Sequence, residues 1–264
     1  MFFGLTREEV AAGLDAVAMQ ILTSTDVAGP PVDAMEVARR LEILVALDDR
    51  QQGRARYVRL GRRHPLEPRA TILLKPDPRR ERRQWAIAHE IGEHAAHRVF
   101  SAWGIDPRET APHVREDVAN GLAGRLLLPS AWFTILGAET GWNLLALKSR
   151  FSTASHELIA RRMLDCPPPV IMTIIDQGAI YMRRSNLAGH APPLAPIEKQ
   201  CWRTVHEENR PERASDALRK IQGWPVHEDQ WKREILRTEV DDSLDDSDVA
   251  EQWQPQMEHR LNTD

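Results

Sequence analysis

A ten-residue stretch in the first half of the chain limits its fold and chemistry more than any other. Residues 85–94 read WAIAHEIGEH, in which Glu90 directly follows His89 and Glu93 comes three residues later. Side chains four residues apart share one face of an α-helix, so this spacing predicts a helix that presents His89 and Glu93 together. The pattern differs at one position from H-E-x-x-H, in which two histidines bind zinc and the glutamate between them is the general base of a metallopeptidase.

Two residues compete for the position of the second ligand. On an ideal helix with roughly 100° per residue, Glu93 lies at about 40° from His89, whereas His94 lies at about 140°. Glu93 therefore converges with His89 without distortion. His94 would need an extra residue in the helix, a π-bulge, which Gly92 would tolerate. Regular geometry favours Glu93, although a second negative ligand weakens the Lewis acidity of zinc.

A third ligand is expected from the next helix, because catalytic zinc takes three protein ligands and keeps a fourth position for water. The helix predicted at about 113–128 offers Glu116 and, one turn earlier, His113. Both can point inward from the same helix face. Glu90 is then the predicted general base. The alternative is a half-buried polar helix whose histidines bind neighbouring carboxylates, and the motif alone does not exclude it.

Composition and charge narrow the class of protein. The 264 residues are 42% hydrophobic and 28% charged, which is typical of a globular protein with one sizeable core and an appendage, or with two modest domains. A net charge of −4 argues against a dedicated nucleic-acid binder. Two cysteines are too few for a disulfide framework, and no segment resembles a signal peptide or a membrane span. A cytoplasmic protein that does not associate with membranes is expected.

Hydrophobic periodicity predicts both helices and strands. One helix is predicted at about 7–24, and a second helix is predicted to follow an Asp33 cap. Further helices are predicted at about 84–100, 113–128, 142–150, 153–164 and 197–208. The predicted strands are 43–47, 55–60, 70–74, 170–176 and 179–183. The last two strands flank Gln177 and Gly178 and predict a β-hairpin. The basic run at 79–83 is interpreted as a solvated approach to the motif helix.

The clearest domain boundary is the run CPPP at 166–169. It separates a predicted first domain, residues 1–165, from an accessory region of a β-hairpin plus a helix at residues 166–236. The remaining residues, 237–264, are acidic and poor in apolar side chains, which predicts a disordered tail.

Four segments, in this order and spacing, resemble the ImmA/IrrE family of metallopeptidases over roughly residues 14–164. They are PPVDAMEVARRL at 30–41, QGRA at 52–55, WAIAHEIG at 85–92 and EDVANGLAGRLLLP at 116–129. The resemblance implies a small zincin-like α+β domain with a short β-sheet beside the active-site helix. It also implies zinc held by His89, by the residue at position 93 and by Glu116, with Glu90 as base. The family pattern has a histidine where this chain has Glu93.

Members of that family characteristically cleave or antagonise helix-turn-helix transcriptional repressors. The resemblance therefore implies a zinc-dependent endopeptidase that cuts a regulatory protein of this kind. Two alternatives stay open. One is a non-catalytic binding or sensor module on the same fold, because Glu93 replaces a family ligand. The other is DNA binding through residues 142–164, where two short helices carry four cations: Lys148, Arg150, Arg161 and Arg162. The acidic total charge favours helices that cap the core instead.

Overall fold

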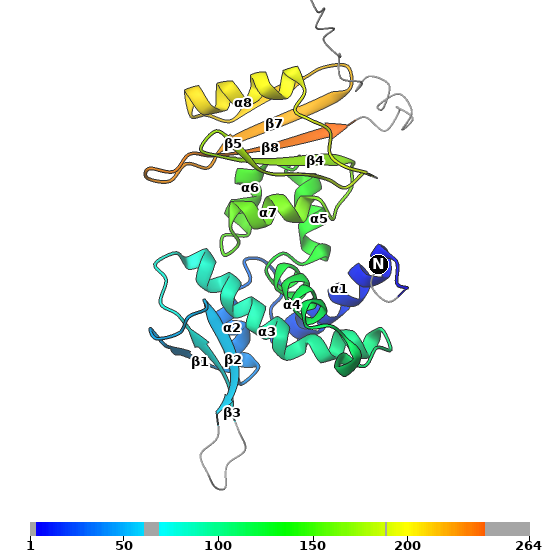
Figure 1. Ribbon diagram of the computed structural model, residues 1–264, viewed down its shortest axis with the longest axis vertical. Helices are drawn as coiled ribbons and strands as arrows, with labels where there is room; N and C mark the ends of the chain where they lie inside the picture. Colours follow the sequence, from blue (N-terminus) through cyan, green and yellow to red (C-terminus); the bar gives the residue numbers. More distant parts are fainter. Residues whose placement is uncertain (1–3, 61–68, 188, 241–264) are drawn as a thin grey trace, which may run out of the picture. The chain divides into compact units, whose positions relative to one another are not determined.

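The computed structural model describes residues 4–60, 69–187 and 189–240 (Figure 1). The chain divides into two compact units, Met1–Arg162 and Met163–Asp264. The division falls just before the CPPP run that marks the boundary in the sequence. Helices and two separate sheets make up the structure, which confirms the predicted α+β class.

The first unit places a small sheet beside a long helix (Figure 1). Its helices are α1 (Arg7–Ser24), α2 (Ala34–Arg40), α3 (Arg80–Ala102), α4 (Pro112–Leu127), α5 (Ser130–Glu139), α6 (Leu144–Arg150) and α7 (His156–Met163), with a 3-10 turn η1 (Pro107–Glu109). Its strands are β1 (Leu44–Leu47), β2 (Ala55–Leu60) and β3 (Arg69–Leu74). The strand order is β1-β3-β2, in which β3 runs parallel to β1 and antiparallel to β2. Strand β2 is thus at an edge of the sheet, and both β2 and β3 contact α3.

Side-chain caps explain where the first two helices begin. Thr6 accepts the backbone N–H of Glu9, and Glu9 accepts the backbone N–H of Thr6, so that a capping box starts α1. Asp33 accepts the backbone N–H of Met35 and caps α2. Both helices begin where the sequence predicted, because these caps are short-range interactions that the local sequence encodes.

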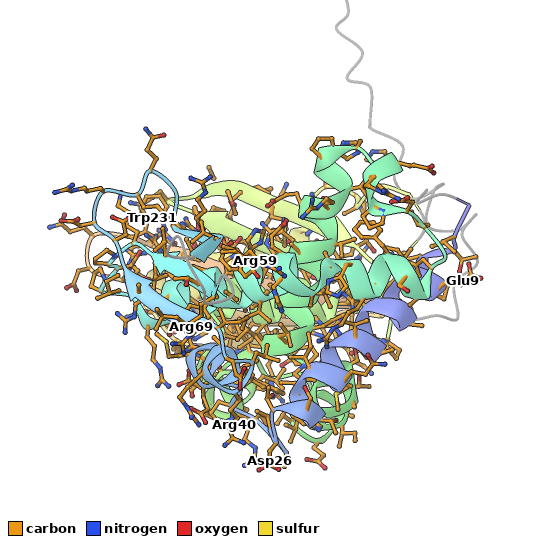
Figure 2. The ribbon with its side chains drawn as sticks, turned by 90° about the horizontal axis from the view of Figure 1, so that it is seen from below. Glu9, Asp26, Arg40, Arg59, Arg69 and Trp231 are labelled. Carbon is orange, nitrogen blue, oxygen red and sulfur yellow. The ribbon has the colours of Figure 1, made fainter. Side chains whose placement is uncertain are left out.

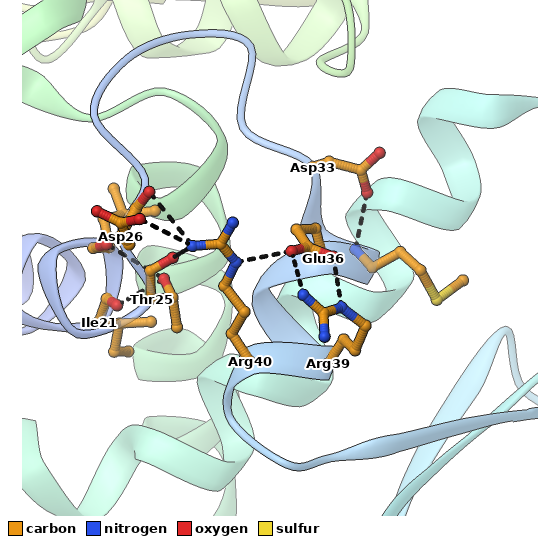
Figure 3. Close-up of polar contacts among 9 residues, drawn as sticks. Ile21, Thr25, Asp26, Asp33, Glu36, Arg39 and Arg40 are labelled. Atoms are coloured by element: carbon orange, nitrogen blue, oxygen red, sulfur yellow. Dashed lines mark hydrogen bonds and ion pairs between the residues drawn. The ribbon is translucent and has the colours of Figure 1, made fainter.

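Charged side chains tie α2 to the end of α1 (Figure 3). Arg40 Nη1 donates to the carbonyl oxygen of Thr25 at 2.8 Å and lies 3.4 Å from Asp26 Oδ2. Figure 2 shows Arg40 and Asp26 close together. Arg40 Nε also donates to Glu36, which accepts two further hydrogen bonds from Arg39. Hydrogen bonds from Arg39 and then Arg40 lower the pKa of Glu36 to about 2.

Helix α3 is longer than predicted, and the basic run is part of it. The helix begins at Arg80 instead of Gln84, so the basic run forms its first turn, and Arg79, Arg80 and Arg82 are exposed there, as the solvated interpretation expects. Glu81 stabilises the added turn, because a carboxylate is favourable near a helix N-terminus and Glu81 Oε1 also accepts from Lys148 Nζ at 2.7 Å. The apolar side chains of α3 face the core, among them Ile87 and Ile91.

Gly92 sets how closely α4 approaches α3. A Cβ atom at Gly92 would lie 2.6 Å from the backbone oxygen of Ala119 on α4, so only glycine fits here. Helix α3 is regular from Arg80 to Ala102. The π-bulge considered for Gly92 is therefore not formed, and the glycine serves close helix packing instead.

Pro129 separates two helices rather than ending the helical region. It follows α4 and forms the N-cap of α5, a helix that the sequence did not predict because proline was interpreted only as a stop. Among the described residues, no single helix has the length and apolar character to cross a membrane. Helices α4 and α5 meet those criteria only as a pair bent by 52°.

The cations of residues 142–164 are mostly bound within the first unit. Lys148 pairs with Glu81, and Arg161 pairs with Glu157 at 2.9 Å. Arg162 is buried and donates to the carbonyl oxygen of Leu128 at 3.2 Å. Lys148 and Arg162 therefore help to hold the first unit together, whereas Arg161 pairs within its own helix.

The second unit is a five-stranded antiparallel sheet with a helix over one face (Figure 1). Its elements are β4 (Val170–Asp176), β5 (Ala179–Ser185), α8 (Pro196–Glu208), β6 (Glu212–Ser215), β7 (Arg219–Pro225) and β8 (Arg233–Val240), and the strand order is β5-β4-β8-β7-β6. The β4–β5 hairpin lies where it was predicted, whereas β6, β7 and β8 were missed. Residues 237–240, assigned to the acidic tail, form the end of β8 because they pair with β4 and β7. The rest of that predicted tail, 241–264, is outside the described residues.

A buried carboxylate joins three parts of the second unit. Glu234 on β8 is fully buried, and its Oε1 lies 2.8 Å from His206 Nδ1 on α8 and 2.9 Å from His227 Nε2. Trp202 Nε1, also on α8, donates to Oε2 at 3.2 Å. Three side chains thus satisfy a group that would be costly to bury alone.

Candidate metal centre

Side chains from α3 and α4 meet where these helices pack together. His89 and Glu93 lie one turn apart on α3, and Glu116 lies near the start of α4. Each offers one ligand atom, and these atoms all lie within 4.8 Å of one another, close enough to hold a metal ion. His89 Nε2 is 3.7 Å from Glu116 Oε2. Across 4–60, 69–187 and 189–240, no other group of three or more histidine, cysteine or acidic side chains brings its ligand atoms together in a way that could hold a metal ion.

The two alternative ligands lie outside this cluster. His94 Nδ1 is 2.9 Å from the phenol oxygen of Tyr57 on β2, and burial lowers the pKa of His94. His113 is exposed in the first turn of α4. Because α3 is regular, His94 keeps the angular offset from His89 that ideal helix geometry predicts.

Asn120 holds His89 in the orientation that a metal ligand needs. Asn120 Nδ2 donates to Glu116 Oε1 at 3.1 Å, and Asn120 Oδ1 lies 3.1 Å from His89 Nδ1. A carboxylate only accepts, so the amide nitrogen must face Glu116 and the amide oxygen must face the ring. His89 Nδ1 then carries the proton, and the lone pair is on Nε2, the atom nearer Glu116. Such an outer hydrogen bond fixes the tautomer and direction of a metal-binding histidine.

Glu90 is positioned by the edge strand of the sheet. Glu90 is 8% exposed, and its Oε2 accepts a hydrogen bond from the backbone N–H of Tyr57 at 2.6 Å. Burial raises the pKa of Glu90, an effect that the Tyr57 hydrogen bond opposes. A carboxylate held by one oxygen, with a pKa above its ordinary value, has the properties of a general base.

Arg115 contacts the cluster from α4. Its Nη2 donates to Glu93 Oε2 at 3.2 Å, with side chains 51% and 25% exposed respectively. Arg115, Asn120 and Tyr57 were not predicted from the sequence to be part of the site. Asn120 could have been found, since it lies four residues after Glu116 and thus on the same helix face. The other two contacts depend on how separate elements pack.

Residues 38–163 match the family model Peptidase_M78, the IrrE N-terminal-like domain. This segment belongs to that family. The match confirms the family inferred from the sequence, and with it a metallopeptidase-type domain of zincin-like fold. A solved structure of a Mycobacterium tuberculosis transcriptional regulator is similar in fold, with a TM-score of 0.60 and 20% sequence identity over 89% of this chain and 80% of that one. No curated protein matches the chain.

The donor set of the IrrE-like domain fits a divalent metal ion. One imidazole nitrogen and two carboxylate oxygens are acceptable zinc ligands, and carboxylates also suit harder ions such as manganese. The partly exposed side chain of Glu116, at the outer end of the cluster, gives an ion a route from solvent. The cluster is thus suited to hold a metal ion at the contact between α3 and α4.

Proposed function

We propose that the IrrE-like domain is a zinc-dependent endopeptidase with His89, Glu93 and Glu116 as metal ligands and Glu90 as general base. The observation that carries this proposal is the convergence of three ligand atoms within 4.8 Å, from two helices, next to a buried glutamate. The order of these groups along α3 also supports it, because Glu90 follows the first ligand directly, as in zinc peptidases.

A bound zinc ion supplies Lewis acidity to a water molecule and to the peptide carbonyl. The chain's own groups do the rest. Glu90 takes a proton from the attacking water and returns it to the leaving amine. The backbone N–H of Tyr57 holds one oxygen of Glu90, which leaves the other oxygen available for this proton. Asn120 keeps the lone pair of His89 on Nε2.

The substrate in this proposal is a helix-turn-helix transcriptional repressor, and the protein acts in the cytoplasm. The resemblance to the ImmA/IrrE family supports this choice of substrate. The similar solved structure is that of a transcriptional regulator, which agrees with a role in regulation. Direct binding of nucleic acid is not part of the proposal, since the cations of α6 and α7 are mostly engaged within the first unit.

Replacement of the general base tests the proposal. The full chain, loaded with zinc, is incubated with a synthetic peptide pool of mixed sequence and with a purified helix-turn-helix repressor, and new N-termini are identified by mass spectrometry. Glu90→Gln should keep zinc and fold but lose cleavage by a factor of about 10² or more. Equal cleavage by the variant and the wild type would refute the mechanism.

A non-catalytic binding or sensor module is the second candidate, and the Arg115 contact to Glu93 favours it. That contact, together with Asn120 between His89 and Glu116, gives the cluster polar partners without an ion. Elemental analysis separates the two candidates. A folded chain that takes up no metal ion and cleaves no peptide would support the binding module.

A further inference from the structure

The candidate centre holds more negative charge than a site with two histidines and one glutamate. Glu93 and Glu116 are both carboxylates, and His89 is the single neutral ligand. A second carboxylate attracts a cation more strongly, but it also donates more charge to the ion and so weakens its Lewis acidity. A positive group near Glu93 would restore the balance.

Arg115 is placed to do this. It contacts Oε2 of Glu93 at 3.2 Å, and within the described residues Oε1 of Glu93 has no hydrogen-bond partner. One oxygen of Glu93 can therefore meet a cation while the other meets the guanidinium group. Arginine keeps its positive charge at any working pH, whereas a histidine at this place would not. Arg115 also directly precedes Glu116, so the helix that brings the third ligand brings this charge with it.

We infer that Arg115 offsets the charge of the Glu93 ligand, so that Glu93 and Arg115 together are equivalent in charge to the neutral histidine of the family pattern. This inference rests on the proposed function, because it assumes that Glu93 binds the metal ion. Arg115 is a positioning and charge-balancing residue, since it acts through Glu93. With Arg115 beside Glu93, the centre binds a cation more weakly, but the bound ion remains a good Lewis acid.

The inference predicts the direction of an affinity change. Arg115 repels a cation bound to the same carboxylate, so removal of its charge should tighten binding. Since Arg115 is half exposed, solvent screens this repulsion, and the expected effect is about tenfold. A residue that only held Glu93 in place would have the opposite effect, because its removal would loosen a ligand.

The test measures zinc affinity of the full chain by competition with a chromophoric chelator. Arg115→Gln removes the charge, and Arg115→Lys keeps it. Arg108→Gln is the matched control, because Arg108 is an exposed arginine paired with Asp106, which is not a ligand. We expect Arg115→Gln to bind zinc about tenfold more tightly than the wild type, and the other two variants to stay within about twofold.

The possible results distinguish failure of the inference about Arg115 from failure of the proposed function. Unchanged or weaker zinc binding by Arg115→Gln, with a wild type that binds zinc, overturns the inference and leaves the proposed function standing. Equal tightening by Arg108→Gln also overturns it, since overall charge would then explain the effect. A folded wild type that binds no zinc contradicts the proposed function itself. Thermal unfolding of each metal-free variant checks that its fold is retained.

Discussion

The substitution Gly92→Ala should disturb both the stability of the first unit and its metal centre. The ideal Cβ of an alanine would lie 2.6 Å from the backbone oxygen of Ala119 and 3.1 Å from its Cα, whereas ordinary contact begins at 3.4 Å. The obstructing atoms are backbone, so a side-chain rotation cannot relieve the clash. Helix α4 must therefore move away from α3 by about 0.8 Å, the difference between these contact distances.

Two energies oppose each other in this variant. Overpacking of a tight contact costs about 1–3 kcal/mol. Alanine in place of glycine in a helix gains up to about 1 kcal/mol. The expected net loss is about 1–2 kcal/mol in the free energy of unfolding. The effect on zinc binding should be larger, because α4 carries Glu116 and metal–ligand distances tolerate only about 0.2 Å. We expect zinc affinity to fall by about tenfold or more, because one of the three ligands would lie outside this tolerance.

Gly124→Ala is the matched control for this prediction. Gly124 also lies in α4, but nothing is within 4 Å of the Cβ it would gain. This variant should be more stable by about 0.5–1 kcal/mol and should keep its zinc affinity. Urea unfolding of the metal-free proteins and chelator competition measure the two quantities. If Gly92→Ala matches Gly124→Ala in both, the close approach at Gly92 does not align the centre.

Three further predictions concern Asn120, Cys201 and Glu234. Asn120→Ala should weaken zinc binding about 10- to 100-fold, because His89 loses the partner that orients it, and unchanged affinity in chelator competition would contradict this. Burial raises the pKa of Cys201 to about 11, so in a Cys166→Ser background at pH 8 it should be labelled by a thiol reagent far more slowly in native protein than in urea. Similar rates would show that the thiol is accessible. Glu234→Ala should lower the free energy of unfolding by about 1–3 kcal/mol in urea titrations, since three partly buried donors lose their acceptor, and an unchanged free energy would speak against that role.

Elements encoded by local signals could be predicted from the sequence. Helix α1 has the predicted bounds, because a capping box starts it and apolar residues recur at helical spacing. The β4–β5 hairpin follows from Gln177 and Gly178 between two apolar strands. Strands β6, β7 and β8 carry many charged residues, and their pairing is largely set by contacts between distant segments. Such strands lack the alternation that marks a half-buried strand.

In the candidate site, too, only the features that the local sequence determines could be predicted. The convergence of His89 with Glu93 follows from helix periodicity alone, and a regular α3 provides it. The choice between Glu116 and His113 depends on how α4 packs against α3, a contact between two separate helices. The contact from Tyr57 depends on the position of β2 beside α3. Neither the packing of α4 against α3 nor the position of β2 beside α3 is encoded within one segment of the sequence.

The metal content of the full chain tests the central claim most directly. Protein stripped with a chelator, reloaded with zinc and desalted is analysed by inductively coupled plasma mass spectrometry, with Glu116→Gln treated in parallel. Glu116 is partly exposed, so this variant should fold normally. We predict about one zinc ion per chain in the wild type and a small fraction of that in the variant. A folded wild type without zinc, or equal zinc in both proteins, would contradict the assignment of the centre.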